Sequence, residues 1–227
     1  MTQASQGPLQ LGTQAPDFTL RAVQGDRTVS LSDYRGSSAL LLCLFRGLYC
    51  PFCRRSIAQM AASSEKLKPL GIESLAVVAT DLDNARLYYR FRPTRVPLAV
   101  DPDLTTHRSY GVPRLDLTPE LVQAVASVRI NPTGELAEPM AVQDASNALD
   151  KMEGYKRTET DRRDEERQFP QLKGQFLIDR DGVIRWLDIE CAREGIAGIG
   201  KFPGHEELLA AAQHCGLTPA FGHLDRL

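Results

Sequence analysis

Seven consecutive residues, from Ala39 to Phe45, are all apolar. A strand with one wet face alternates apolar and polar residues, whereas an unbroken apolar run is typical of a strand covered on both faces, as in a parallel sheet. The run is far too short to cross a bilayer. Downstream residues spaced three or four apart predict an amphipathic helix that ends near Gly71; these are Ile57, Met60, Ala61, Ser64 and Leu67. The sequence therefore predicts an α/β fold built on a central buried strand.

The alternation of strands and helices continues along the chain. Apolar strands are predicted at 72–79 and 98–100, with a helix between them that ends near Phe91. Much later, the Asp-Gly pair at 181–182 lies between two apolar runs, which is a strong hairpin signal. Residues 204–214 predict a closing helix. This order predicts a mixed central sheet flanked by helices.

The domain organisation follows from length and local composition. The chain has 227 residues, of which 42% are hydrophobic, and this suits a single globular domain. Residues 1–11 are polar and are predicted to form a disordered tail, so the domain is expected to span residues 12–227. An insertion at about 114–173, before the C-terminal hairpin, interrupts the α/β pattern. A small hairpin is expected inside it at 128–136.

The second half of the insertion is dominated by charge. From Lys151 to Gln168, six basic residues accompany six acidic ones, with almost no apolar stripe. The pattern favours a solvated, mobile helix outside the core, because a polar helix has no face to bury. A lid and a dimer contact are the alternatives.

The charge balance and the cysteine count exclude several classes of protein. A net charge of −2 gives no general attraction to nucleic acid or to a membrane surface. The polar N-terminus lacks the basic and apolar regions of a secretory signal. Five cysteines, of which only two lie close together, do not make a disulfide scaffold. A cytoplasmic protein is therefore expected, and in that reducing compartment a close cysteine pair indicates redox chemistry or metal binding.

The close pair is Cys50 and Cys53, in Cys-Pro-Phe-Cys, where the buried strand gives way to a helix. Proline favours the first helical position, so Pro51 predicts Cys50 as the N-cap residue. The backbone N–H groups and the positive end of the helix dipole then point at both sulfurs, which lowers a thiol pKa. Arginines at 46, 54 and 55 add positive charge nearby. The pair is therefore predicted to be redox-active.

Two other interpretations of the pair remain open at this stage. A zinc site needs two more ligands, and Cys191, His205, His214 and Cys215 offer no second pair with metal-binding spacing. The pair can also consist of inert core thiols. Cys43 is predicted to be a buried apolar residue and Cys215 incidental, while Cys191 is a weaker candidate for a distant resolving thiol. The sequence contains no recognisable metal, flavin or nucleotide motif, so no cofactor is expected.

Four segments of the sequence together resemble a known family. They are Gly12–Leu20, the strand leading into Cys50–Cys53, Tyr110–Val112 and Phe176–Arg185. In this order they resemble the redoxin branch of the thioredoxin superfamily, specifically peroxiredoxin-like proteins of the alkyl hydroperoxide reductase/thiol-specific antioxidant family. The resemblance covers roughly residues 12–112 and 174–214. It implies a thioredoxin-like fold and thiol-based reduction of peroxides or disulfides.

The chain also departs from that family. In peroxiredoxins a Thr or Ser lies three residues before the attacking cysteine and a Pro lies seven residues before it. If Cys53 is aligned with that cysteine, Cys50 stands in place of the Thr or Ser and Arg46 in place of the Pro. Lys173 occupies a position that is usually Arg in peroxiredoxins and cis-Pro in thioredoxin-type reductases. Lys173 either brings positive charge to the sulfurs or is simply exposed, and both interpretations remain open.

The sequence thus predicts a thiol-dependent oxidoreductase that reduces peroxides or disulfides through Cys50 and Cys53. A disulfide reductase with little peroxidase activity and a non-enzymatic redox sensor are the alternatives. A dithiol such as thioredoxin or glutaredoxin is the expected reductant, and a homodimer is left open. Cys50 is predicted to attack first because an N-cap sulfur accepts backbone N–H groups, while Cys53 lies one turn into the helix and is expected to be more buried.

Overall fold

The structure is a computed structural model that describes residues 9–217. Its strands are β1 (Thr19–Ala22), β2 (Thr28–Ser30), β3 (Ala39–Phe45), β4 (Ile72–Val78), β5 (Leu98–Val100), β6 (Arg129–Ile130), β7 (Met140–Ala141), β8 (Gly174–Ile178) and β9 (Ile184–Ile189). Its α-helices are α1 (Pro51–Leu67), α2 (Leu82–Phe91), α3 (Thr105–Ser109), α4 (Pro119–Ser127), α5 (Val142–Glu153), α6 (Glu159–Gln168) and α7 (His205–His214). Short 3₁₀ helices span Leu31–Asp33, Lys68–Leu70 and Gly195–Gly198.

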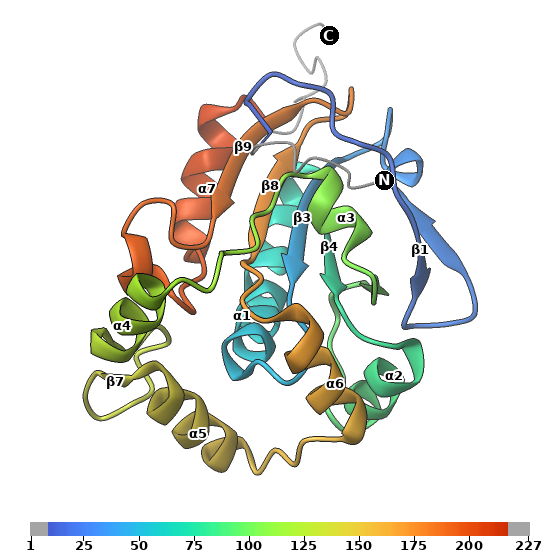
Figure 1. Ribbon diagram of the computed structural model, residues 1–227. Helices are drawn as coiled ribbons and strands as arrows, with labels where there is room; N and C mark the ends of the chain where they lie inside the picture. The colour runs from blue at the N-terminus through green and yellow to red at the C-terminus, as the bar shows by residue number, and fades with distance from the viewer. Residues whose placement is uncertain (1–8, 218–227) are drawn as a thin grey trace, which may run out of the picture.

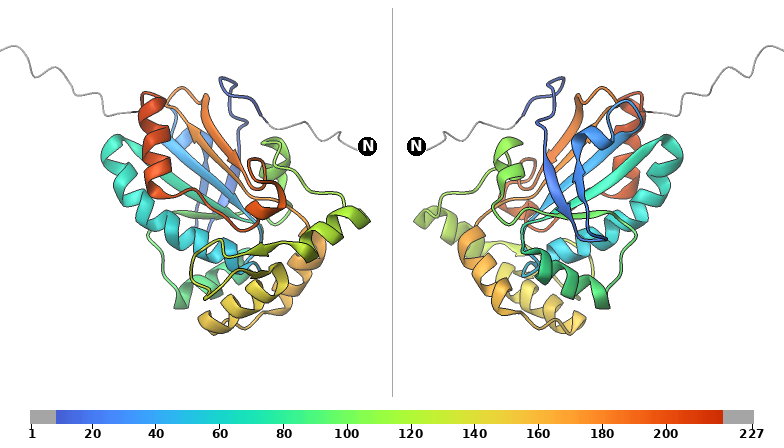
Figure 2. Two further views of the ribbon diagram at one scale, coloured as in Figure 1. Left: turned by 90° about the vertical axis from the view of Figure 1, so that its left-hand side faces the viewer. Right: turned by 90° about the vertical axis from the view of Figure 1, so that its right-hand side faces the viewer.

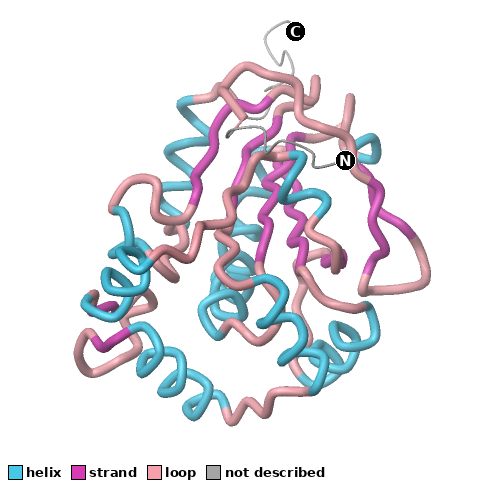
Figure 3. The backbone as a smooth tube through the Cα atoms, viewed as in Figure 1, coloured by secondary structure: helices cyan, strands magenta, loops and turns pink. Residues whose placement is uncertain are grey.

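A seven-stranded sheet in the order β2-β1-β5-β4-β3-β8-β9 forms the centre of the molecule (Figures 1 and 3). The pairs β3–β4 and β4–β5 are parallel, whereas β8 and β9 continue the sheet in antiparallel pairings on the other side of β3. The predicted mixed sheet, the predicted hairpin and the thioredoxin-like fold class are confirmed.

Strand β3 lies between β4 and β8 and is buried on both faces, as its unbroken apolar run predicts. Its odd-numbered residues, such as Leu41 and Cys43, pack into the core beneath α1 and α7, which lie side by side (Figure 2). Its even-numbered residues, such as Leu42, face a second core that includes Tyr110 and Phe18. Strand β3 therefore fixes the position of whatever follows it.

The residues between α3 and β8 wrap around the end of the sheet where the parallel strands finish (Figures 1 and 2). The small hairpin forms from β6 and β7, so its return strand lies later than the predicted 128–136. The Asn131 side chain exchanges two hydrogen bonds with the backbone of Leu136, and the chain turns back only after that loop.

The prediction of a solvated helix for residues 151–168 is confirmed only in part: half of these residues are exposed, but they form parts of two helices and three of their polar side chains are buried. Gly154, with φ of 64°, ends α5, and a new helix, α6, begins after Thr158. Asp161 is buried and accepts hydrogen bonds from Asn84 Nδ2 and the Tyr155 hydroxyl, so polar side chains replace an apolar stripe as the packing surface.

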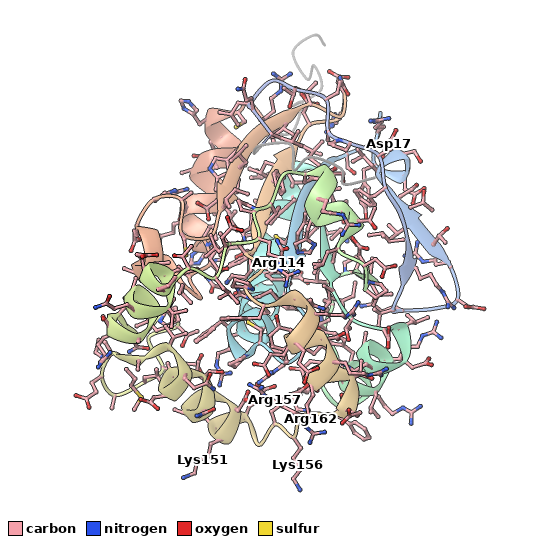
Figure 4. All side chains as sticks on the ribbon, viewed as in Figure 1. Asp17, Arg114, Lys151, Lys156, Arg157 and Arg162 are labelled. Carbon is pink, nitrogen blue, oxygen red and sulfur yellow. The ribbon has the colours of Figure 1, made fainter. Side chains whose placement is uncertain are left out.

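Only part of this segment points outward. Lys151 and Lys156 extend away from the molecule, while Arg157 lies between α5 and α6 (Figure 4), where it forms ion pairs with Asp150 and Glu165. The segment is thus a folded layer held to α1, to α2 and to the loops at the end of the sheet by ion pairs and hydrogen bonds.

Two further expectations concern the ends of the chain and membranes. Residues 1–8 of the predicted tail at 1–11 lie outside the described residues. Within residues 9–217, no helix combines the length and the apolar character needed to cross a bilayer.

Candidate functional site

Cys50 and Cys53 lie at the junction of β3 and α1, where the sequence places them. Cys50 is the N-cap residue of α1 in an extended conformation, and Pro51 is the first helical residue. The Cys50 sulfur accepts a hydrogen bond from the backbone N–H of Cys53 at 3.3 Å. The structure therefore brings the two thiols to the N-terminus of one helix, as the spacing predicts.

Both cysteines are covered. Cys50 is 4% exposed and Cys53 is fully buried, within a shell that includes Tyr49 and Phe52. From the end of α6, the buried Gln168 side chain accepts a hydrogen bond from the N–H of Gly47 at 2.8 Å and donates one to the carbonyl of Ala79. Helix α6 is thereby attached to the loop that carries Cys50.

Arg46 is the arginine that reaches the cysteine pair. Its Nη2 lies 3.5 Å from the Cys50 sulfur, and its guanidinium forms a bidentate ion pair with Glu190, at 2.7 and 3.1 Å. A fork of this kind fixes the guanidinium in one orientation. Arg46 is therefore held as a fixed positive charge against Cys50.

The expectation that Arg54 and Arg55 also charge the sulfur environment is wrong. The buried Arg54 forms ion pairs with Asp150 and Glu153 of α5, and Arg55 forms ion pairs with Glu135 and Glu153. Both guanidinium groups thus face carboxylates of the insertion, and their charges are locally balanced.

Lys173 is buried near the sulfurs, which confirms one of its two interpretations and excludes the exposed one. Its Nζ donates to Ser56 Oγ at 3.3 Å and to the carbonyls of Gly200 and Lys201 at 3.1 and 2.9 Å. It also lies 3.7 Å from Glu190 Oε1. This ammonium group links α1 to the loop before α7.

Glu190 is the centre of the charged network. Besides Arg46, its carboxylate accepts hydrogen bonds from the N–H of Lys173 at 3.1 Å and the N–H of Gly200 at 2.8 Å. Burial raises the pKa of Glu190, but Arg46, Lys173 and the Gly200 N–H outweigh burial and hold it below its usual value. The carboxylate is therefore ionised at neutral pH.

The two thiols have opposite pKa shifts. Burial raises the pKa of Cys50, but hydrogen bonding from Cys53 and the charges of Arg46 and Lys173 outweigh burial and lower it to about 5. Burial, the hydrogen bond to Cys50 and the charge on Cys50 raise the pKa of Cys53 well above its usual value. At neutral pH the site thus pairs a thiolate on Cys50 with a protonated thiol on Cys53.

This asymmetry predicts the pH dependence of alkylation. Because only the thiolate reacts, the rate of Cys50 alkylation by iodoacetamide should rise through a midpoint at about pH 5 and then level off. A free cysteine has its midpoint near pH ~8.5. Alkylation rates of the wild type and of Cys50→Ser, measured from about pH 4 to about pH 9, check this, because that range includes both midpoints. The variant should lose the low-pH phase. A wild-type midpoint like that of a free cysteine contradicts it.

The remaining cysteines lie elsewhere. Cys43 is buried in β3 as predicted. Cys191 lines a small pocket of about 110 Å³, where burial and Glu190 raise its pKa to about 12, so it is a poor nucleophile at neutral pH. Cys215 donates to the carbonyl of Arg185. In the part of the chain that the structure describes, no three His, Cys, Asp or Glu side chains gather to hold a metal ion.

Glu190 and Gln168 are site residues that sequence reasoning missed. One signal for Glu190 was present, because an antiparallel hairpin that pairs Gly174 with Ile189 also places Lys173 beside Glu190. A lysine and a glutamate at the matching ends of two apolar strands suggest a buried ion pair. No such signal marked Gln168, which lies in a run of charged residues.

Residues 11–187 match the model of the AhpC/TSA family. The thiol-disulfide oxidoreductase ResA of Bacillus thuringiensis subsp. konkukian is 27% identical over 46% of this chain and 59% of its own length. ResA of Halalkalibacterium halodurans is 29% identical over 57% of this chain and 72% of its own length. The chain therefore spans less than two thirds of the first of these relatives.

Solved structures show the same fold. One is a protein from Chlorobium tepidum described as a putative thiol:disulfide interchange protein DsbE. The match covers 92% of this chain and 99% of that protein, with a TM-score of 0.54 and 22% identity. Peroxidoxin BcpB from Mycobacterium tuberculosis covers 91% and 97%, with a TM-score of 0.55 and 14% identity. A 2-Cys peroxiredoxin from Plasmodium vivax covers 97% and 92%, with a TM-score of 0.56 and 16% identity.

Proposed function

Because the chain belongs to the AhpC/TSA family, we propose that it is a thiol-dependent oxidoreductase that reduces peroxides or disulfides through Cys50 and Cys53. The observation that carries this proposal is the paired thiolate and thiol at the N-terminus of α1, beside the fixed cation Arg46. Inert core thiols have raised pKa values, whereas Cys50 has a lowered one.

With a hydroperoxide, the Cys50 thiolate attacks the outer oxygen. The S–O bond forms, the O–O bond breaks, and the leaving alkoxide or hydroxide takes a proton, so the peroxide is reduced and Cys50 becomes a sulfenic acid. The Cys53 sulfur then attacks Cys50, the S–S bond forms, and water leaves with the Cys53 proton. A dithiol donor restores both thiols and becomes a disulfide itself. With a disulfide substrate, the thiolate attacks one sulfur, the substrate S–S bond breaks, and one half of the substrate leaves as a thiol after taking a proton. Cys53 then attacks Cys50 in the mixed disulfide and releases the second half as a thiol.

Arg46 and Lys173 support both steps. Arg46 lies against the Cys50 sulfur and the buried Lys173 lies beside Glu190, and both positive charges stabilise the thiolate before attack. The same cations favour negative charge that develops on a leaving oxygen or sulfur nearby.

Oxidation is expected to join Cys50 to Cys53 within one chain, because the two lie across one helical turn and already share a hydrogen bond. Peptide mapping of the protein after mild peroxide treatment, without reductant, checks this. Recovery of Cys50 or Cys53 mainly bound to Cys191 or to another chain contradicts it.

The function is tested by comparing two oxidants. Stopped-flow oxidation with hydrogen peroxide and with a model disulfide gives two rates, and steady turnover with dithiothreitol supports an enzyme. Since Cys50 is 4% exposed, a small peroxide is favoured as the faster oxidant. Faster reaction with the disulfide supports a reductase instead, and a single stoichiometric oxidation without turnover contradicts enzymatic function.

We also propose a reducing, cytoplasmic compartment and a thioredoxin- or glutaredoxin-type donor. All five cysteines are free in the structure, which suits such a compartment. Cell fractionation tests the location, and size-exclusion chromatography tests the homodimer left open by the sequence.

A further inference from the structure

The end of α2 and the loop after it form a basic and apolar surface. Residues 84–100 contain four arginines and no acidic residue, in a chain whose net charge is −2. Within this stretch Phe91 is 69% exposed and Leu87, one helical turn earlier, is 48% exposed. Large apolar groups exposed beside arginines are typical of protein interaction sites.

This surface borders a cleft of about 540 Å³, which we call the arginine cleft. One wall comes from the first three turns of α1, beginning with Arg54 directly after Cys53, and another comes from the end of α2 and the loop to Arg95. The insertion closes a third side with Glu135 and Glu153. The arginine cleft therefore begins next to the cysteine pair in α1.

Arg54 and Arg55 are largely buried against carboxylates of the insertion, so the exposed positive charge of the cleft lies at its edge, on Arg95. Four arginines and two glutamates line the cleft: Arg54, Arg55, Arg92, Arg95, Glu135 and Glu153. Glu153 forms ion pairs with Arg54 and Arg92 and accepts a hydrogen bond from the Tyr88 hydroxyl, so its carboxylate is already neutralised within the protein. Arg95 is 87% exposed and, within residues 9–217, forms one loose ion pair, with Glu65 at 3.7 Å. The edge of the cleft thus offers Arg95, and in part Arg92, to an incoming anion.

We propose that the arginine cleft, together with Leu87 and Phe91, docks an acidic segment of the protein dithiol that reduces the Cys50–Cys53 disulfide. This inference rests on the proposed function, because it names the partner of that site. Charge complementarity selects an acidic segment, and the two exposed apolar side chains supply the contact area that charges alone lack.

The location of the cleft fits a donor of electrons. Helix α2 lies at the same end of the sheet as the start of α1 (Figures 1 and 2). Because both cysteines are almost completely covered, a bulky donor has to be held beside the site until the sulfurs become accessible. In the transfer, the two donor thiols are oxidised to a disulfide. Their two electrons and two protons reduce the Cys50–Cys53 disulfide to two thiols.

The test uses two synthetic peptides that carry the same Cys-Gly-Pro-Cys dithiol, flanked either by runs of Glu or by runs of Lys. Each peptide reduces preformed Cys50–Cys53 disulfide, and the rate is followed at low and at high salt. At low salt the Glu peptide should react about tenfold faster than the Lys peptide. The ratio should fall toward one as salt screens the charges.

Arg90 is an exposed residue of α2 next to Phe91, and Arg95 lies at the edge of the cleft. The double variant Arg90→Glu/Arg95→Glu should abolish or invert the ratio, while the rate with dithiothreitol stays unchanged. The control is Arg180→Glu/Arg185→Glu, an identical charge change in the β8–β9 turn and at the start of β9, which should keep the wild-type ratio. Equal rates with both peptides on the wild type, or an unchanged ratio in the Arg90→Glu/Arg95→Glu variant, overturn the proposal.

A different occupant would also be recognised. Arginine-dependent binding to phosphatidylserine vesicles, without a preference between the peptides, overturns the proposal in favour of a membrane surface. Absence of turnover with both hydrogen peroxide and the model disulfide contradicts the proposed function. The peptide ratio is measured on a preformed disulfide and does not depend on that turnover.

Discussion

A Cys50→Ser variant should lose at least about a thousandfold in the rate of oxidation by peroxide or disulfide, because it removes the thiolate on which the first step depends. Cys53 is not expected to replace it at neutral pH, since Cys53 is fully buried and burial raises its pKa. Stopped-flow oxidation under single-turnover conditions measures the loss. Thermal unfolding of the reduced variant checks that the fold persists.

The matched variant, Cys53→Ser, should behave differently. It should keep a thiol that reacts rapidly with iodoacetamide and should accumulate a sulfenic acid or a mixed disulfide on Cys50, because the resolving sulfur is missing. Its turnover with dithiothreitol should fall. If Cys50→Ser instead still forms a sulfenic acid rapidly, Cys53 is the attacking cysteine, and the site follows the peroxiredoxin pattern at that position.

The second large effect concerns the buried charges of Lys173 and Glu190 near Cys50. Forming the disulfide removes the thiolate's negative charge and leaves Arg46 and Lys173 facing only Glu190. The network therefore favours the reduced state. Lys173→Met should raise the pKa of Cys50 and stabilise the disulfide, whereas Glu190→Gln should lower the pKa and destabilise the disulfide.

The expected size is about tenfold in the thiol–disulfide equilibrium for each variant, in opposite directions. Tenfold corresponds to one pKa unit, or about 30 mV in potential. Equilibration with a glutathione buffer measures the potential, and the pH profile of alkylation measures the pKa. A merely structural role would loosen the site in both variants, so shifts of the same sign contradict the electrostatic account.

Much of the fold was predictable because its signals are local. The apolar run at 39–45 specifies a strand with two buried faces, and each face does pack into its own core. The Asp-Gly pair at 181–182 specifies the hairpin, where Gly182 has φ of 81°, a conformation that a side chain disfavours. These features depend on neighbouring residues and are therefore visible in the sequence.

The insertion was not predictable in the same way. Charge-rich residues 151–168 indicated a solvated helix, yet Asp161 and Gln168 are buried because partners distant in sequence, Asn84 and Gly47, satisfy their hydrogen bonds. A polar packing surface leaves no hydrophobic periodicity. Its partners become apparent only when the chain is folded.

The sequence by itself determined the strand, the helix and the position of the cysteine pair between them. An N-cap sulfur followed by Pro51 is a local arrangement that any chain with these residues can adopt. The tertiary structure alone decided the charges around the pair. It directed Arg54 away to α5, held Arg46 against Cys50 through Glu190, and buried Lys173 beside them. Electrostatic interactions act through space, so the pKa of Cys50 depends not only on its sequence neighbours Cys53 and Arg46 but also on Lys173 and Glu190, more than a hundred positions away.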